Sequence, residues 1–174
     1  LDGDGALDGV SACEGRNRTL YIHWAPKDRS RYLEPAAWTT EPLPASRKKQ
    51  SWMFVLPMQV DGRHGVDLIT GSKGSGAAIG WFEAPEDPRQ LDAWTYHKLI
   101  DAGWIMSLQA KDLDRDGDMD VLLSDRRGGR RGVKWLENPS PEAAAAGKPW
   151  PEHKLDAGDR EAMFLNTGDI DGDG

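Results

Sequence analysis

The sequence predicts an all-β protein built from about three tandem repeats, each containing four short strands. The 20 glycines and 11 prolines are spread along the 174 residues rather than clustered, which is typical of short strands joined by turns. In addition, four sequence landmarks recur with a period of 53 to 59 residues. A fixed period of this length indicates a repeat architecture, here within one predicted domain, 1–174.

The four landmarks share one register. An aspartate marks each of four related acidic segments, with spacings of 59, 53 and 57 residues, at Asp2, Asp61, Asp114 and Asp171. The other landmarks are sets of Trp or Met residues: Trp24, Trp81 and Trp135; Trp38, Trp94 and Trp150; Met53, Met106 and Met163. We expect these apolar positions to lie between neighbouring sheets. The predicted repeats are 1–52, 53–105 and 106–162, with a truncated fourth beginning at 163–174.

Each period contains about four strand-sized apolar stretches. The strands predicted for the second repeat are 53–60, 66–69, 78–82 and 95–100, and those for the third are 105–110, 121–123, 133–136 and 153–155. The segment 139–147 contains four alanines but is flanked by prolines, and we expect it to be a loop. Four short strands per period is the pattern of a β-propeller blade, a four-stranded antiparallel sheet.

Three repeats make an incomplete ring, because propellers close with about four to eight blades. The chain begins inside one acidic segment and stops inside another, and Leu1 is not an initiator methionine. We therefore expect this sequence to be a fragment of a longer chain. Its expected partners include the missing propeller blades of the same parent protein.

The third acidic segment has the composition of a calcium loop. Its alternating aspartates and one glycine are Asp112, Asp114, Asp116, Gly117, Asp118 and Asp120. Calcium prefers six to eight oxygen ligands, and a glycine permits the sharp turn. An EF-hand would need a glutamate at position twelve, which is Leu123 here, and flanking helices. The sequence instead predicts a Ca²⁺ site in a loop between two strands, with Asp118 offering its backbone carbonyl.

The other copies of this loop are incomplete. The first retains three carboxylates, at Asp2, Asp4 and Asp8, and the last has Asp169, Asp171 and Asp173. The second reads Gln59, Asp61, Arg63, Gly65 and Asp67 at the corresponding positions. Because Arg63 stands where an oxygen ligand is needed, we expect the second loop to be metal-free, with the arginine replacing the cation.

These residues resemble the FG-GAP/VCBS repeat family. The likeness is carried by SLQAKDLDRDGDMDVLLSD followed by GVKWLENP, and by DGDGALDGV followed by YIHWAP. The resemblance implies an integrin-α-like propeller with calcium in the first hairpin of each blade, and an extracellular, periplasmic or cell-surface location. It also implies side-chain ligation by Asp112, Asp114, Asp116 and Asp120, with the Asp118 carbonyl completing the set.

Composition and motifs exclude several classes of function. The formal net charge of −7 argues against a nucleic-acid partner. No stretch approaches the roughly 18 apolar residues of a membrane helix. Cys13 is the only cysteine, so neither an intrachain disulfide nor a cysteine-based zinc cluster is possible. His97 and His153 occupy equivalent repeat positions, which favours a structural role, and we assign no catalytic residue.

Basic residues gather in the loops expected at the edge opposite the calcium loops. The predicted ligand-binding residues are Arg126, Arg127, Arg130, Arg131, Lys48 and Arg160. They suit an acidic polysaccharide partner. We therefore expect a non-catalytic calcium-binding module with a binding or scaffold role. Two alternatives stay open: the propeller part of a carbohydrate-active lyase or dehydratase whose catalytic residues lie outside this chain, and an adhesion module that binds protein.

Overall fold

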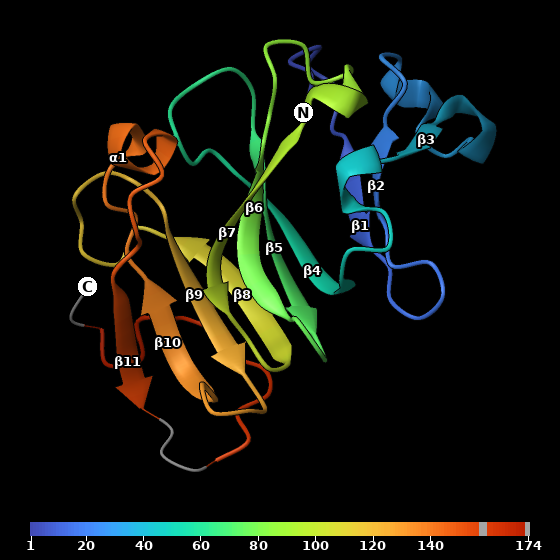
Figure 1. The fold of residues 1–174 in the computed structure, drawn as a ribbon. Coiled ribbons are helices and arrows are strands. Elements are labelled where there is room, and N and C mark those ends of the chain that lie inside the picture. The colour runs from blue at the N-terminus through green and yellow to red at the C-terminus, as the bar shows by residue number, and fades with distance from the viewer. Residues whose placement is uncertain (157–159, 173–174) are drawn as a thin grey trace.

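The computed structural model describes residues 1–156 and 160–172 and consists of three antiparallel sheets (Figure 1). Sheet 1 contains β1 (Gly9–Ala12), β2 (Leu20–Trp24) and β3 (Thr39–Pro42). Sheet 2 contains β4 (Ser51–Met58), β5 (Asp67–Lys73), β6 (Ala78–Glu83) and β7 (Thr95–Asp101). Sheet 3 contains β8 (Ile105–Lys111), β9 (Asp120–Asp125), β10 (Gly132–Leu136) and β11 (Glu152–Asp156). Within each sheet the strands pair in chain order, so every connection is a simple hairpin.

Short helices interrupt the connections. They are the 3₁₀ helices η1 (Arg29–Arg31), η2 (Pro35–Ala37), η3 (Pro44–Ser46) and η4 (Leu91–Ala93), and the single-turn helix α1 (Pro141–Ala145). The all-β prediction is confirmed, and each of the eight strands expected in the second and third repeats is present. The prediction that residues 139–147 form a loop is partly wrong, because this segment contains α1. Pro141 is tolerated in the first turn of a helix, and the Ser140 hydroxyl caps it by accepting from the Ala143 N–H at 3.3 Å.

The methionine landmark has a common structural basis. In β4 the pairing with β5 shifts register between Trp52 and Phe54, and in β8 the pairing with β9 shifts between Ile105 and Ser107. Met53 and Met106 are therefore the extra residues of two equivalent β-bulges. A bulge bends its strand at a fixed place, which explains why the same position recurs.

The tryptophan landmark that begins at Trp24 is out of register by two residues. Gly9 follows the aspartate of the first loop and pairs with His23, whereas Leu68 follows the aspartate of the second loop and pairs with Phe82. The residue two before Trp24, Ile22, is thus the counterpart of Trp81. Ile22 in sheet 1 and Trp81 in sheet 2 are both bulky and apolar, and either residue can fill this position. Matching tryptophan to tryptophan in the sequence therefore gives the wrong register.

The sheets bury their faces against one another in two cores. One core lies between sheets 2 and 3 and includes Trp81 and Trp150, and the other lies between sheets 1 and 2 and includes Trp24 and Trp94. The first strands of sheets 2 and 3 meet, since β4 contacts β8, and β1, which follows the first aspartate loop as β5 follows the second, contacts β4. The expectation that the recurring Trp and Met residues lie between sheets is therefore met in part, because Trp38, Trp135 and the three landmark methionines belong to neither core.

The segment after residue 160 lies against sheet 3. The Gln109 side-chain amide donates to the Leu165 carbonyl at 3.0 Å, and the Ser124 hydroxyl donates to the Met163 carbonyl. This placement matches that of β8 on sheet 2, where Ile105 lies against Gly71. The start of the fourth repeat therefore continues the stacking order of the first three.

The hairpin loops divide between two edges of the molecule (Figure 1). We use the name aspartate edge for the edge that carries loops 1–8, 59–66 and 112–119. The connections between the third and fourth strands lie at the same edge. The opposite edge, with loops 13–19, 43–50, 74–77, 102–104 and 126–131, is the basic edge. Loops of the basic edge contact each other: the Lys48 N–H donates to the Arg18 carbonyl at 2.8 Å and the Gly74 N–H to the Gly103 carbonyl at 3.0 Å. No helix among the described residues is long and apolar enough to cross a bilayer.

Candidate functional site

The third aspartate loop gathers carboxylates through its own backbone hydrogen bonds. The Asp112 carboxylate accepts the Arg115 N–H at 2.6 Å and the Gly117 N–H at 3.2 Å. Arg115 and Gly117 have φ angles of 67° and 102°, and this left-handed backbone wraps the chain around its own side chains. As a result, carboxylate oxygens of Asp112, Asp114 and Asp116 lie within 4.8 Å of one another.

The carboxylates in this loop repel one another. Burial, followed by the neighbouring carboxylates of Asp116, Asp120, Asp114 and Asp112, raises the pKa of Asp118 to about 6. The Asp118 Oδ1 atom is buried without a hydrogen-bond partner among the described residues. The loop therefore suits a cation, and its carboxylate oxygens are the ligands that Ca²⁺ prefers.

Asp120 makes a different contact from the other aspartates. Its Oδ2 accepts the Leu113 N–H and its Oδ1 accepts the Asn138 N–H, each at 2.9 Å. Asp67 makes the same pair of bonds to the N–H groups of Val60 and Ala84, at 2.9 and 2.8 Å. The closing aspartate thus ties each loop to the chain that follows the third strand. The resemblance implied metal ligation by Asp120, for which only the second lone pair of each oxygen remains.

The second loop is closed by Gln59 rather than by Arg63. The Gln59 Nε2 donates to the carbonyls of Arg63 at 2.9 Å and Gly65 at 2.6 Å, while its Oε1 accepts the N–H groups of Asp61 and Gly62 at 3.2 and 3.1 Å. The Arg63 side chain is 56% exposed, and its Nε lies 4.0 Å from Asp61 Oδ2. The Arg63 guanidinium thus lies at ion-pair distance from Asp61, as expected of an arginine in place of the cation, while the Gln59 amide holds the loop carbonyls together. The sequence signal was the Asp-to-Gln change at the first position of the loop.

The first loop is held by an arginine from the neighbouring sheet. Arg89 Nε donates to Asp2 Oδ2 at 2.6 Å, and the guanidinium carbon lies 4.6 Å from the centre of the Trp24 ring. Burial opposes ionisation of Asp2, but hydrogen bonds from the Asp4 N–H and Arg89 lower its pKa below the ordinary value. Asp4 Oδ1 accepts the Ala6 N–H at 2.8 Å, and Asp8 accepts the Ala25 N–H at 2.9 Å.

The start of the fourth loop repeats the local geometry of the third. The Gly172 N–H donates to Asp169 Oδ1 at 2.7 Å, as Arg115 does to Asp112. Asp171 lies between these two residues, and Asp173 lies outside the described residues.

The two repeated histidines form equivalent cross-strand pairs. His97 Nε2 lies 2.8 Å from Glu83 Oε2 and its ring stacks on Trp81 with centroids 4.6 Å apart. His153 pairs with Glu137 at 2.6 Å and stacks on Trp135 at 4.3 Å. In sheet 1 the same two positions are joined by the Trp24 Nε1–H donating to Glu41 at 2.9 Å. The cross-strand contact therefore recurs in all three sheets although the residues that make it change.

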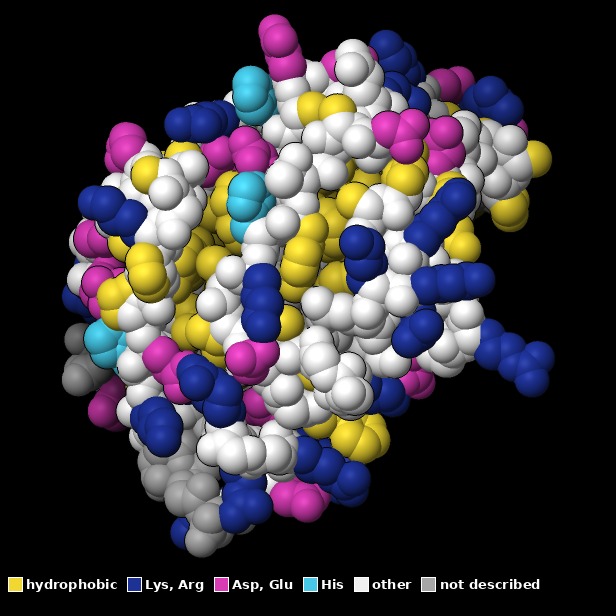
Figure 2. Space-filling model, in the orientation of Figure 1, with side chains coloured by type: hydrophobic (Ala, Val, Ile, Leu, Met, Phe, Trp, Pro, Cys, Tyr) yellow, Lys and Arg dark blue, Asp and Glu magenta, His cyan; other side chains and the backbone are white. Residues whose placement is uncertain are grey.

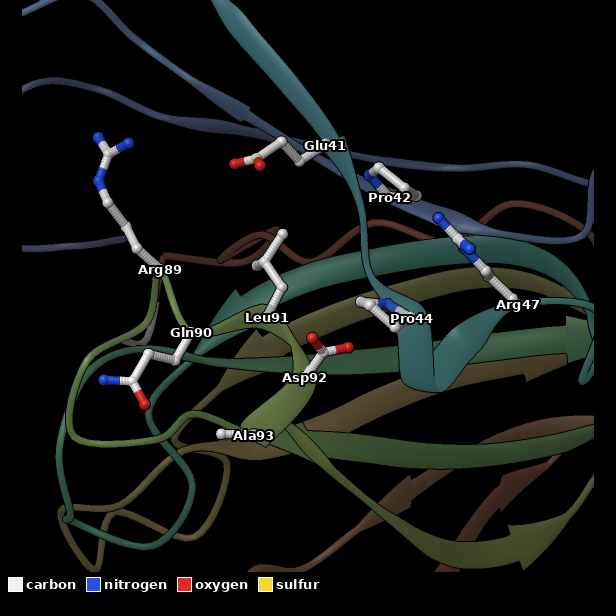
Figure 3. A pocket seen from close by; sticks show the side chains of 9 residues that line it. All are labelled: Glu41, Pro42, Pro44, Arg47, Arg89, Gln90, Leu91, Asp92 and Ala93. Carbon is white, nitrogen blue, oxygen red and sulfur yellow. The ribbon is translucent and has the colours of Figure 1, made fainter.

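A groove of about 730 Å³ lies between β3–η3 of sheet 1 and the η4 loop of sheet 2 (Figure 3). Arg89 and Arg47 stand on opposite sides of it, with Glu41, Leu91 and Asp92 between them. Its two carboxylates balance its two guanidinium groups, and Arg89 and Glu41 are already bonded to Asp2 and Trp24. The groove therefore has no charge preference that identifies a ligand.

The basic edge is less uniformly positive than the sequence suggested. Figure 2 shows Lys and Arg side chains over the right-hand and lower parts of the face in view, with acidic side chains among them. Arg126 pairs with Glu161 at 3.0 Å, and Arg130 pairs with Glu152. Although burial opposes it, Lys134 and then Arg130 lower the pKa of Glu152. Of the other predicted ligand residues, Arg127, Arg131, Lys48 and Arg160 have exposed side chains.

Sequence reasoning missed the residue that organises this edge, Trp104. Its indole lies beside three cations, with Lys73 Nζ at 4.7 Å, Arg127 Cζ at 4.9 Å and Arg126 Cζ at 5.5 Å from the ring centroid. No repeat landmark includes Trp104, so periodicity gave no signal for it.

Comparisons of this chain with protein-family models, with curated proteins and with solved structures found no match.

Proposed function

We propose that this chain is a non-catalytic calcium-binding module of β-propeller blades that serves as a binding or scaffold part of a larger secreted or surface protein. The observation that carries this proposal is the contrast between the second and third aspartate loops. Both have left-handed residues at the same two positions, with φ of 71° at Gly62 and 48° at His64, matching Arg115 and Gly117. The same backbone is closed by an amide in one loop and left with clustered carboxylates in the other.

Calcium is the ion that fits the third loop best. The cluster offers only carboxylate and carbonyl oxygens, whereas zinc and copper sites use nitrogen or sulfur ligands. Magnesium demands near-ideal octahedral geometry and keeps several waters, whereas calcium accepts the irregular oxygen shell of a loop. Asp112, Asp114 and Asp116 would hold the ion, and the Asp118 carbonyl would add a neutral oxygen.

The blade assignment is supported by the repeated sheets. The first strands of sheets 2 and 3 contact each other, and each sheet buries an apolar face against its neighbour. Stacking around inner first strands is the arrangement of propeller blades. A calcium ion in such a module would fix the hairpin between the first two strands of sheet 3.

Isothermal titration with CaCl₂ tests the calcium site in the wild type and in two matched variants. Asp114→Ala removes a carboxylate from the third loop, and Asp61→Ala removes the carboxylate at the equivalent position of the second loop. We expect binding with a Kd of about 10⁻⁴–10⁻³ M, as in extracellular calcium modules, lost in Asp114→Ala and retained in Asp61→Ala. Equal heats from the wild type and Asp114→Ala would remove the assignment.

Recognition of acidic carbohydrate at the basic edge is a second candidate function. The observation that favours it is that groups from different repeats contact each other there, since Lys73 pairs with Glu14 and the Arg126 N–H donates to the Trp104 carbonyl at 2.8 Å. Their cations therefore form one surface. Replacing Arg126, Arg127, Arg130 and Arg131 together by Ser should abolish the salt-sensitive binding of uronic or sulfated glycans, and unchanged affinity would exclude this surface.

A further inference from the structure

We propose that the cation cluster around Trp104 binds the carboxylate groups of an acidic carbohydrate, and that Glu14 and Glu161 occupy the same cations when no ligand is bound. This inference rests on the second candidate function and names the centre of its site. The cluster is formed by Trp104, Lys73, Arg126 and Arg127, which come from the end of β5 and from two loops of the basic edge.

Three cations lie within 5.5 Å of one ring centroid. The negative face of an indole attracts cations, but the three like charges repel one another. The nearby carboxylate of Asp125 is 1% exposed and accepts the N–H groups of Gly103 and Trp104 at 2.8 and 2.7 Å. Asp125 therefore fixes the loop from below and is not available as a surface partner.

Two exposed carboxylates complete the cluster. Glu14 pairs with Lys73, and Glu161 pairs with Arg126 at 3.0 Å. Their side chains are 52% and 53% exposed, whereas those of Lys73 and Arg126 are 23% and 26% exposed. Exposed carboxylates lose little when they return to water, so a ligand carboxylate can replace them on the less exposed cations. The internal pairs thus show which anion chemistry the cluster accepts.

The indole nitrogen provides an additional donor. Trp104 Nε1 is buried and has no hydrogen-bond partner among the described residues. A buried N–H without an acceptor is unfavourable, and an incoming carboxylate that shifts the covering cations would supply one. Arg127 has an exposed side chain and stacks on the same ring, so it is the cation best placed to move with the ligand.

The cluster favours a carbohydrate over a peptide because its backbone is already bonded. The Gly103 carbonyl accepts the Gly74 N–H at 3.0 Å and the Trp104 carbonyl accepts the Arg126 N–H at 2.8 Å. An extended peptide binds a sheet edge through main-chain hydrogen bonds, and the main-chain groups of Gly103 and Trp104 are already bonded within the chain. The available donors are side-chain cations and one indole N–H, which suit carboxylates spaced along a uronic-acid oligosaccharide.

The test is calorimetric titration of the full chain with oligogalacturonate in calcium-containing buffer. We expect Lys73→Gln/Arg127→Gln to weaken binding by about tenfold or more, the size of losing a charge-assisted hydrogen bond. Trp104→Phe keeps the ring and loses the N–H, and it should weaken binding about threefold to tenfold. Glu14→Gln/Glu161→Gln should tighten binding by a similar factor. The control Glu34→Gln/Glu86→Gln removes two exposed carboxylates at the aspartate edge and should leave the affinity unchanged.

The possible outcomes separate this inference from the proposed function. If Arg47→Gln/Lys49→Gln abolishes binding while Lys73→Gln/Arg127→Gln does not, the basic edge binds glycan elsewhere and the Trp104 site is overturned. If Glu14→Gln/Glu161→Gln tightens binding no more than its control, the two glutamates do not occupy the site. Equal binding of poly-glutamate would overturn the commitment to carbohydrate. If neither uronic nor sulfated glycans bind the folded chain, both this inference and the second candidate function are wrong.

Discussion

Converting the second aspartate loop into a calcium site requires two substitutions, Gln59→Asp and Arg63→Asp together. Positions 59, 61 and 63 correspond to Asp112, Asp114 and Asp116, so the double variant recreates the carboxylate trio on a backbone that already has the same left-handed residues. Arg63→Asp alone should not bind, because the Gln59 amide still donates to the Arg63 and Gly65 carbonyls. Gln59 is thus predicted to be the residue that excludes the ion.

The magnitude follows from the bonds that are exchanged. Replacing Gln59 removes four hydrogen bonds, and at this exposed position the net cost is about 1–2 kcal/mol for the set. With a Kd of about 1 mM, 10 mM calcium stabilises the native state by about 1.4 kcal/mol. For a chain of this size that corresponds to a rise of about 3–6 °C in Tm. The double variant should therefore melt below the wild type in EDTA and recover most of the difference in calcium.

The assay is done in the Asp114→Ala background, which silences the third loop, so that calcium heat beyond that of Asp114→Ala alone comes from the second loop. Titration calorimetry and thermal melting with and without calcium are measured for both single variants and the double variant. Calcium binding by Arg63→Asp alone as tight as that of the double variant would refute the role of Gln59. A folded double variant without calcium heat would refute the equivalence of the two loops.

Three further predictions concern stability and the loop backbone. Asp67→Ala and Asp120→Ala should each lower the free energy of unfolding in EDTA by about 2–4 kcal/mol, because each leaves two backbone N–H groups without an acceptor; a much smaller loss in urea denaturation would contradict the tie between loop and sheet. Gly103→Ala would place a Cβ 1.8 Å from the Arg127 carbonyl oxygen, so it should destabilise the chain by about 1–3 kcal/mol and weaken oligogalacturonate binding, and wild-type values for both would exclude the close approach. Burial, reinforced by Asp61 and Glu83 and opposed by two backbone hydrogen bonds, raises the pKa of Asp67 from 3.8 to about 7, so the folded state binds the proton more strongly than the unfolded state between these values. The urea midpoint of the calcium-free protein should therefore fall as the pH rises from 5 to 8, and a midpoint that rises over this range would show that the carboxylate form is the preferred one.

The repeat period and the strand positions were predictable because they depend on local composition. Alternating turn residues and apolar stretches recur in the second and third repeats, and all eight strands expected there exist. The Trp24 landmark failed because a bulky apolar side chain satisfies the same space at Ile22 and at Trp81, so identity of residue type was a poor guide to register. The pairing partners across the sheet define the register, and these are not visible in one sequence.

The carboxylate cluster of the third loop was also predictable from local composition, since its aspartates occupy every second position of one short segment. Gln59 and Trp104 were not, because their roles depend on groups brought together by folding. Gln59 looks like the loss of a ligand, yet its amide makes the bonds that a cation would otherwise organise. Trp104 has no counterpart in the landmarks, yet cations from the end of β5 and from another loop converge on it.

An aspartate-rich segment is usually taken to indicate both a closed hairpin loop and an ion-binding site. In the second and third loops these two properties are separate. The closing aspartates, Asp67 and Asp120, make the same bonds to the chain beyond the third strand in both loops, so they maintain the hairpin whether or not an ion is present. The choice between metal and amide rests on the first position, where an aspartate adds a charge to the cluster and a glutamine supplies two donors. Because the closing aspartates hold the hairpin in both loops, replacing Gln59 together with Arg63 is expected to change ion binding while the sheet keeps its shape. A chain of stacked sheets can therefore carry calcium in one repeat and dispense with it in the next.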